Sequence, residues 1–168
     1  AGSMGGRCRL IYFNENDPYA AAWLRNLYPN AIVDDRSIVD VKPRDVGSYE
    51  RCHFFGGIAG WEYALELAGW PAGREVWTGS CPCTPFSVSG KRRGFDDERH
   101  LWPEFLRLIG EERPRTLFGE QVTSRLGREW LAGVRSDLAA LGYAVWAVDL
   151  GAASIGAPHI RQRLFWVA

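Results

Sequence analysis

The chain has 168 residues, of which 46% are hydrophobic, and its 20 basic and 20 acidic side chains give a formal net charge of zero. A chain of this length and composition can bury one sizeable core, which excludes a disordered or fibrous protein and favours a single compact domain. The balanced charge excludes a general excess of Lys and Arg, so any nucleic-acid surface must be a local patch.

Signals for membrane insertion or export are not visible. No apolar run approaches the roughly 18 residues of a membrane span, and the first residues lack the apolar core of a signal peptide. The four cysteines lack paired metal-ligand spacing, so we expect a reduced, cytoplasmic protein without a metal. Residues 1–6 have the character of a tag remnant, and residues 7–168 form the expected domain.

The first part of the chain predicts a strand, a helix and a second strand. Residues 9–13 form a short apolar run, and residues 19–27 show the Ala, Leu and Trp spacing of an amphipathic helix. Asp17 can cap this helix at its N-terminus, and Pro18 suits its first turn. Residues 31–33 then predict the second strand.

A charged connection at residues 34–49, with room for one short helical turn around Arg44, leads to the next unit. Residues 52–55 predict a strand that enters a glycine-rich turn, and residues 61–68 predict a helix that stops at the following glycine. Residues 75–78 predict a strand that runs directly into a Cys-Pro-Cys segment.

The remainder of the chain continues this alternation. Residues 88–99 are rich in Gly, Ser and charge and predict a loop, of a kind that often closes over substrates. The elements expected after it are a helix at residues 101–109, a strand at 116–119, a helix at 128–141, and strands at 143–149 and 164–168. Strands that alternate with helices predict an α/β fold with a mostly parallel sheet covered by helices on both faces.

The Cys-Pro-Cys segment places Cys83 just after a strand, where open α/β sheets hold ligands and reactive groups. A cysteine near a strand is more often a small buried residue than a nucleophile. Pro82 and Pro85 fix the backbone near Cys83, which suits a side chain that must be aimed at a substrate atom.

Residues 79–87 read Gly-Ser-Cys-Pro-Cys-Thr-Pro-Phe-Ser and resemble Gly-Gly-Pro-Pro-Cys-Gln-Pro-Phe-Ser, the nucleophile motif of the DNA (cytosine-5) methyltransferases. The family pattern continues as Ser-x-x-Gly and Gly-x-x-Asp-x-Arg-x-x-Leu, to which residues 87–90 and 94–102 are similar. Residues 118–122 resemble its Glu-Asn-Val motif, and residues 156–165 resemble Gly-Val-Pro-Gln-x-Arg-x-Arg-x-Phe. The resemblance implies a Rossmann-like fold that binds S-adenosylmethionine.

The chemistry implied by the resemblance is methyl transfer to carbon 5 of cytosine in DNA. Cytosine reacts poorly at carbon 5 until a thiolate adds to carbon 6, and Cys83 can supply a thiolate near neutral pH. The resemblance assigns Glu120 to the proton at ring nitrogen 3, and Arg161 and Arg163 to orientation of the base and its phosphate. The target base must be flipped out of the duplex because the reacting carbon is buried there.

The cofactor site is implied by three segments. Residues 54–60 resemble the family's Leu-Phe-Ala-Gly-Ile-Gly-Gly turn, which passes under the methionine portion of S-adenosylmethionine. Residues 13–20 resemble Asn-Glu-x-Asp-x-x-Ala, in which Glu15 would bind the ribose hydroxyls, and residues 36–41 resemble Gly-Asp-Ile. The cofactor residues implied in this way are Phe55, Gly57, Ile58, Gly60, Glu15, Asn16, Ser37 and Ile38, and Pro82 of the nucleophile motif is expected to join them.

The order of these segments differs from that of the family, in which the glycine turn comes first. The expected parts are a ribose- and adenine-binding part at residues 7–49, a glycine-turn part at 50–70 and a catalytic part at 75–168. The chain thus resembles a permuted enzyme, which the sheet tolerates because one right-handed helix joins the glycine-turn strand to the Cys-loop strand. The family's adenine-binding aspartate falls on Ser37, with Asp35 nearby as a substitute. An alternative alignment treats residues 14–27 as the family's C-terminal Gly-Asn helix moved forward.

The family's target-recognition domain and final helix would follow residues 156–165, and this sequence ends at Ala168. Without that domain, DNA affinity would rest on phosphate contacts rather than on base edges. The expected DNA contacts are Ser87, Lys91, Arg92, Arg93 and Arg99. We expect a weak or short sequence preference, or a separate partner that supplies specificity; the sequence makes no prediction of oligomeric state.

Two alternatives remain open. The same chemistry can act on single-stranded DNA, on RNA or on a free cytidine nucleotide, whose bases are already exposed. A non-catalytic module that binds S-adenosylmethionine or DNA is suggested by Ala59, Thr84 and Gln121, which depart from the family's residues. In each case we expect a cytoplasmic protein of bacterial or phage origin, without a membrane partner.

Overall fold

The computed structural model describes residues 11–82 and 101–168. Outside these ranges lie the first two residues of the strand expected at 9–13 and the whole loop expected at 88–99. The predicted site residues that lie outside the described ranges are Cys83, Ser87, Lys91, Arg92, Arg93 and Arg99.

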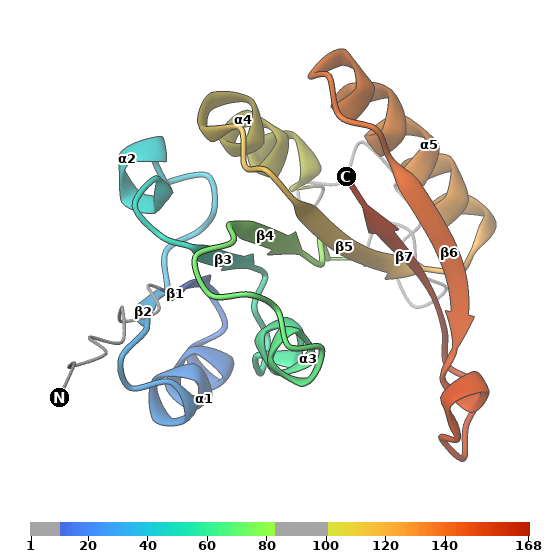
Figure 1. The fold of residues 1–168 in the computed structure, drawn as a ribbon, viewed down its shortest axis with the longest axis horizontal. Helices are drawn as coiled ribbons and strands as arrows, with labels where there is room; N and C mark the ends of the chain where they lie inside the picture. The colour runs from blue at the N-terminus through green and yellow to red at the C-terminus, as the bar shows by residue number, and fades with distance from the viewer. Residues whose placement is uncertain (1–10, 83–100) are drawn as a thin grey trace, which may run out of the picture.

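One seven-stranded sheet organises the described residues, with the strand order β2-β1-β3-β4-β5-β7-β6 (Figure 1). Its strands are β1 (Ile11–Asn14), β2 (Ile32–Asp34), β3 (Arg51–Phe54), β4 (Val76–Gly79), β5 (Leu117–Val122), β6 (Trp146–Gly151) and β7 (Gln162–Val167). The neighbours from β2 to β5 pair in parallel, whereas β7 is antiparallel to both β5 and β6. The predicted α/β class with a mostly parallel sheet is therefore confirmed.

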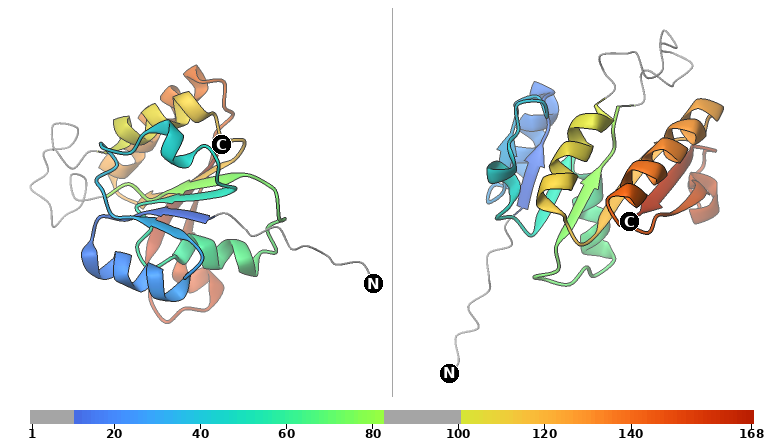
Figure 2. Two further views of the ribbon diagram at one scale, coloured as in Figure 1. Left: turned by 90° about the vertical axis from the view of Figure 1, so that its left-hand side faces the viewer. Right: turned by 90° about the horizontal axis from the view of Figure 1, so that it is seen from above.

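Helices cover both faces of the sheet. They are α1 (Pro18–Leu27), α2 (Pro43–Val46), α3 (Gly60–Leu67), α4 (Trp102–Glu112) and α5 (Arg125–Ala140), and a short 3-10 helix η2 (Ala152–Ile155) joins β6 to β7. Figure 2 shows α1 and α3 on one face of the sheet and α2, α4 and α5 on the other. No helix among the described residues is both long and apolar enough to cross a membrane.

Local sequence sets where two of these helices begin. Asp17 Oδ1 accepts a hydrogen bond from the Ala20 backbone N–H at 2.8 Å, and Pro18 stands in the first turn of α1, as predicted. Helix α5 begins at Arg125 rather than at residue 128, because Ser124 Oγ caps it by accepting from the Gly127 N–H at 2.9 Å. The Ser124 cap therefore adds almost one turn to the predicted helix.

Large aromatic side chains fill the main core, between the sheet and helices α4 and α5. Phe54 of β3 packs on Phe105 of α4 with 4.9 Å between ring centroids, and Trp102 packs edge-on against Trp166 of β7 at 6.1 Å. Glycine is required at Gly79, because a Cβ there would lie 2.2 Å from a ring carbon of Phe105. The central strands are thereby held at close range to α4.

Strands β3 and β4 are neighbours in the middle of the sheet, and their pairing explains how the permuted order of the sequence segments is accommodated. They pair in parallel, with Phe54 opposite Gly79, and α3 is the connection between them, as the sequence predicts. The N-terminal strands β1 and β2 add to the outer edge of β3. The glycine-rich turn after β3 therefore lies between the end of β1 and the end of β4.

Strands β5 and β6 differ from their predicted bounds by up to three residues. Strand β6 begins at Trp146 rather than at residue 143, because Tyr143 closes the end of α5 through a backbone bond to Leu138 O at 2.9 Å. The Tyr143 hydroxyl also donates to Pro114 O at 2.8 Å, which holds this residue away from the sheet. Strand β5 is longer than expected and reaches Val122, because its last residues pair with β7.

Candidate active site

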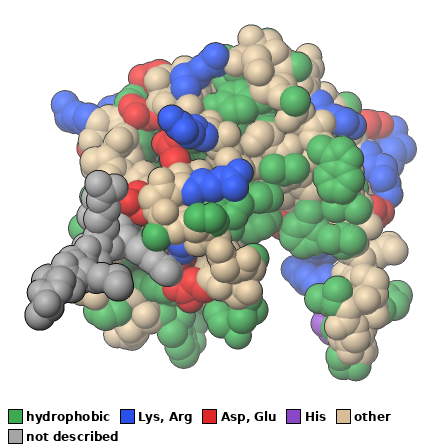
Figure 3. All heavy atoms as spheres, in the orientation of Figure 1, with side chains coloured by type: hydrophobic (Ala, Val, Ile, Leu, Met, Phe, Trp, Pro, Cys, Tyr) green, Lys and Arg blue, Asp and Glu red, His purple; other side chains and the backbone are tan. Residues whose placement is uncertain are grey.

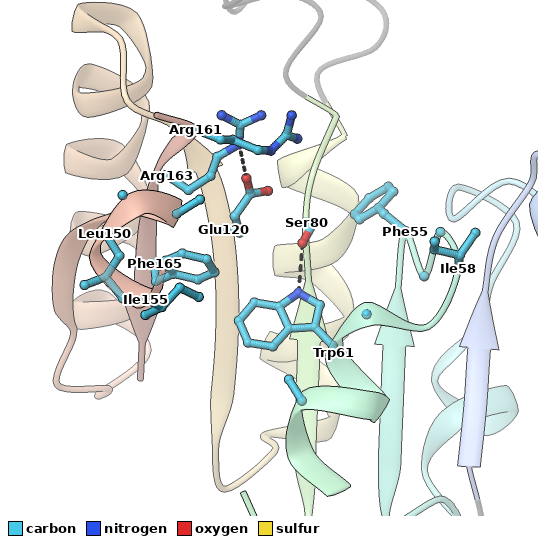
Figure 4. A pocket seen from close by; sticks show the side chains of 16 residues that line it. Phe55, Ile58, Trp61, Ser80, Glu120, Leu150, Ile155, Arg161, Arg163 and Phe165 are labelled. Atoms are coloured by element: carbon cyan, nitrogen blue, oxygen red, sulfur yellow. Dashed lines mark hydrogen bonds and ion pairs between the residues drawn. The ribbon is translucent and has the colours of Figure 1, made fainter. Parts of the chain in front are cut away.

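A cleft of about 560 Å³ opens at the carboxyl ends of β3, β4 and β5, within the size range of small-molecule sites. Figure 3 shows a notch between the tip of the β6–β7 connection, at lower right, and the rest of the molecule. The cleft is lined by the glycine-rich turn, the start of α3, Ser80, β5 and the β6–β7 hairpin (Figure 4). Aromatic and aliphatic side chains form much of the wall, and Glu120, Arg161 and Arg163 supply its charge.

The glycine-rich turn has a backbone that is open toward solvent. Phe55, Gly57 and Ala59 have φ angles of 56°, 54° and 66°, in the left-handed region that non-glycine residues seldom adopt. A Cβ built on Gly57 or on Gly60 meets nothing within 4 Å. The turn thus presents free space in which a ligand can approach its backbone closely.

Glu15 lies against this turn although 42 residues separate it from Gly57. Its Oε2 accepts a hydrogen bond from the Gly57 N–H at 2.7 Å, and its Oε1 accepts from the Asp17 N–H at 2.9 Å. The structure therefore brings together the predicted ribose-binding carboxylate and the predicted methionine-binding turn. A carboxylate and an open glycine turn fit the hydroxyls and the backbone-facing portion of an adenosyl cofactor.

Two aspartates at the end of β2 have different partners. Asp35, the proposed substitute for the adenine-binding aspartate, is ion-paired with Arg25 of α1 at 2.8 Å and is well exposed. Asp34, which the prediction placed outside the strand, instead ends β2 and accepts from the Tyr12 hydroxyl at 2.7 Å. The predicted cofactor residues Ser37 and Ile38 follow this loop, with Ile38 buried in the main core.

Electrostatics hold Asp34 in its charged form. Burial opposes this, but hydrogen bonds from Arg36 and Tyr12 outweigh it and lower the pKa of Asp34. Burial and the same hydrogen bond raise the pKa of Tyr12, so its hydroxyl stays neutral. Asn14 also fixes the loop by donating Nδ2–H to Arg36 O at 2.9 Å.

The predicted catalytic side chains meet on the opposite wall of the cleft. Glu120 projects from β5 and is ion-paired with Arg163 of the adjacent strand β7. Arg163 also donates to Gln162 O at 2.8 Å, which limits the freedom of its guanidinium group. Figure 4 shows Arg161 and Arg163 converging near Glu120 above Phe165. These three charged side chains are thus brought together as the sequence predicts.

The end of β4 lies between the two walls. Ser80 follows Gly79 in the wall of the cleft, and the chain continues through Cys81 and Pro82 to Cys83, which is outside the described residues. Cys81 is 5% exposed, and burial raises the pKa of its thiol. Burial thus favours the neutral thiol of Cys81, which disfavours nucleophilic attack by its sulfur.

Two groups of residues escaped the sequence-based prediction. Trp61 lines the cleft, although its position in the chain predicted only a helical residue; an aromatic directly after a glycine-rich turn was the available signal. The second group lies buried beneath the turn. Arg51 donates to Glu62 Oε1 at 2.5 Å, and His53 Nε2 lies 2.9 Å from Glu62 Oε2. The signal for this group was the presence of two basic residues in a strand that is fully buried.

Comparisons with known proteins agree with this geometry. The family described as C-5 cytosine-specific DNA methylase matches residues 2–168. The Type II methyltransferase M.AgeI of Thalassovita gelatinovora is 28% identical over 173 residues, which cover 98% of this chain and 36% of that protein. The Type II methyltransferase M.NgoMIV of Neisseria gonorrhoeae is 37% identical over 99 residues, which cover 57% of this chain and 32% of that protein. This chain thus spans about a third of the length of these two relatives.

Solved structures share the fold. A putative DNA modification methyltransferase encoded within an E. coli prophage superposes with a TM-score of 0.59 at 19% identity, covering 94% of this chain and 46% of that chain. A Spodoptera frugiperda DNMT2 variant superposes with a TM-score of 0.62 at 14% identity, covering 93% of this chain and 41% of that chain. Together with the match over nearly the whole sequence, the fold and the cleft show that this chain belongs to the C-5 cytosine-specific DNA methylase family.

Proposed function

We propose that this chain transfers a methyl group from S-adenosylmethionine to carbon 5 of cytosine in DNA, through a covalent adduct of Cys83 at carbon 6. One observation carries this proposal: Glu120, Arg161 and Arg163 share a single cleft with the glycine-rich turn and with Ser80, three residues before Cys83. The cleft therefore combines a wall suited to the cofactor with a wall suited to a polar base.

The proposed cofactor wall consists of the glycine-rich turn and Glu15. Phe55, Gly57, Ile58 and Gly60 would face the cofactor across the open side of the turn. The Glu15 carboxylate would accept hydrogen bonds from the ribose hydroxyls. When bound, S-adenosylmethionine supplies an electrophilic methyl group, and the residues of this wall orient it and exclude water. Asn16, Ser37, Ile38 and Pro82 remain proposed members of the site.

Replacing Glu15 by glutamine is expected to weaken binding of S-adenosylmethionine about 10- to 100-fold, because the proposed hydrogen bonds from the ribose hydroxyls would lose their charged acceptor. Calorimetry with the purified protein measures this. Glu129→Gln is the matched control, because the Glu129 carboxylate pairs with Arg125 on α5, on the opposite face of the sheet from α3, and should leave affinity within about twofold. Equal losses in the two variants would contradict the assignment of Glu15.

The proposed base wall acts on the flipped cytosine. Addition of the Cys83 thiolate to carbon 6 moves the ring electrons toward carbon 5 and nitrogen 3, and a carboxyl group at nitrogen 3 can hold the proton that stabilises this charge. Glu120 is proposed for that role, and its ion pair with Arg163 orients the carboxylate in the cleft. Arg161, which also lines the cleft, would contact the base or its phosphate.

Replacing Glu120 by glutamine is expected to lower kcat about 10²- to 10⁴-fold with little change in cofactor affinity, because the amide cannot deliver a proton to ring nitrogen 3. Single-turnover methyl transfer measures the rate. The control is Asp149→Asn on β6, whose carboxylate forms a comparable ion pair with Arg128 and should leave the rate unchanged. A Glu120→Gln variant as fast as the wild type would exclude this role.

Contacts to DNA are proposed for Ser87, Lys91, Arg92, Arg93 and Arg99, which follow the nucleophile in the sequence. A weak sequence preference, or a separate partner that supplies specificity, follows if these phosphate contacts dominate affinity. The division into parts at residues 7–49, 50–70 and 75–168 is likewise a proposal, compatible with the positions of β1, β3 and β4 in the sheet.

Transfer of a labelled methyl group tests the proposed function. The purified chain is incubated with labelled S-adenosylmethionine and, in parallel, duplex DNA, single-stranded DNA, RNA or a cytidine nucleotide, and the products are digested to nucleosides. We expect labelled 5-methylcytosine from duplex DNA. If label appears only in single-stranded DNA, RNA or the nucleotide, the proposed substrate changes and the proposed chemistry stands. Cofactor binding without methyl transfer to any of the four would favour a non-catalytic module.

A further inference from the structure

Trp61 lines the cleft, and Figure 4 shows its ring below Ser80, between Phe165 on one side and Phe55 and Ile58 on the other. Its indole Nε1–H donates to Ser80 Oγ at 2.9 Å. Among the described lining residues this bond directly joins the start of α3 to the end of β4. It therefore connects the segment that follows the glycine-rich turn with the segment that leads to Cys83.

The indole ring is held in place by two other aromatic rings. Phe118 of β5 stacks on it with 5.8 Å between centroids and 27° between planes. Phe165 of β7 meets it edge-on at 6.0 Å and 82°. Offset stacks and edge contacts of this kind are favourable and limit ring rotation, so the direction of the Trp61 N–H is fixed by its surroundings.

Both ends of the hydrogen bond stand at points where the backbone changes direction. Trp61 is the second residue of α3, directly after Ala59 in its left-handed conformation and Gly60. Ser80 is the first residue after β4, whose last residue, Gly79, pairs with Phe54 at the end of β3. The pairing of β3 with β4 thus places the carboxyl ends of these strands side by side, and the Trp61 hydrogen bond fixes Ser80, the first residue after β4.

We propose that Trp61 is a positioning residue for methyl transfer, which acts through Ser80 to hold the chain entering the nucleophile segment in register with the glycine-rich turn. This inference rests on the proposed function. Methyl transfer needs the donor and acceptor carbons aligned at close range, so a small shift between these two segments costs rate rather than affinity. The Ser80 hydroxyl acts as the acceptor, and Trp61 as the donor.

The test uses a double-mutant cycle of Trp61→Phe, Ser80→Ala and both together. Phenylalanine keeps an aromatic ring against Phe118 and Phe165 but removes the N–H, and alanine removes only the hydroxyl. Each single variant is expected to lower kcat per active site about 3- to 10-fold, with the KM for S-adenosylmethionine within about twofold of the wild type. The double variant should have about the same kcat as the slower of the two single variants, because both changes break the same hydrogen bond.

Trp70→Phe is the matched control. Trp70 also packs on Phe118, at 5.7 Å, but its N–H donates to Arg74 O at 3.0 Å rather than to Ser80. It should retain the wild-type kcat. Active-site titration with 5-fluorocytosine DNA gives the active fraction of each preparation, so that a partly unfolded variant is not mistaken for a slow one.

The outcomes separate this inference from the function on which it rests. A wild-type chain that transfers no methyl group overturns the proposed function, and the inference with it. If the wild type is active but the Trp61→Phe and Ser80→Ala losses in kcat multiply in the double variant, the inference alone is overturned. A Trp70→Phe variant that is as slow as Trp61→Phe also overturns it. Coupled losses confined to kcat support it.

Discussion

Replacing Cys83 by serine is expected to lower the rate of methyl transfer by at least about 10³-fold, because a serine hydroxyl is not ionised near neutral pH and cannot add to carbon 6. Binding of S-adenosylmethionine should persist, since the proposed cofactor wall is built from Glu15 and the glycine-rich turn. Labelled-methyl transfer and calorimetry measure the two properties on the same preparation.

Cys81→Ala is the control for this substitution. Cys81 stands two residues before Cys83, is 5% exposed, and has a thiol whose pKa is raised by burial. It should therefore retain transfer activity, although loss of a buried side chain lowers stability somewhat. If activity survives in Cys83→Ser but disappears in Cys81→Ala, the assignment of Cys83 as the nucleophile is wrong.

Replacing Glu62 by glutamine is expected to lower the free energy of unfolding by about 3–5 kcal/mol, since it leaves a buried guanidinium without its counter-ion. Arg51 and Glu62 are 1% and 0% exposed, and Arg51 donates to Glu62 Oε1 at 2.5 Å. His53 joins the same carboxylate and lies 2.9 Å from Thr78 Oγ1 of β4. The network therefore ties α3, β3 and β4 together beneath the cleft.

Urea denaturation measures this loss as a shift in the midpoint at constant slope. Glu129→Gln on α5 is the control, because its carboxylate forms an exposed ion pair with Arg125 that should contribute no more than about 0.5 kcal/mol. A Glu62→Gln variant as stable as Glu129→Gln would show that the buried network is dispensable.

The same network makes stability fall in acid. Burial lowers the pKa of His53, so its ring stays neutral in the folded protein. Burial opposes ionisation of Glu62, but hydrogen bonds and charges from His53 and Arg51 prevail and lower its pKa. For both groups the unfolded chain binds protons more readily, so stability is full near neutral pH and declines below about pH 6.5, the ordinary pKa of histidine.

The positions of the elements follow from local sequence, and their bounds depend on long-range contacts. The spacing at residues 19–27 and the Asp17 cap predict α1 closely, because both act within one helical turn. The end of β5 was misplaced because it depends on pairing with β7, and the start of β6 was misplaced because Tyr143 bonds back to Leu138 and to Pro114. Periodicity carries no information about such partners.

The candidate site shows the same division. Motifs assign Glu120, Arg161 and Arg163 to one site, and the structure places them in one cleft. The resemblance to a permuted enzyme assigns Glu15 and Gly57 to one cofactor site, and the structure adds the hydrogen bond between them. The Trp61 bond to Ser80 and the Arg51–Glu62 pair join residues from separate elements, so only the folded chain reveals them.

Covalent trapping reports the proposed chemistry most directly. A 5-fluorocytosine residue in duplex DNA blocks release of the enzyme after methyl transfer, because fluorine replaces the hydrogen that must leave carbon 5. With S-adenosylmethionine present, we expect a stable protein–DNA adduct whose peptide map places the link on Cys83, and no adduct with Cys83→Ser. An active wild-type chain that forms no adduct, or an adduct linked through Cys81, would contradict the proposed mechanism.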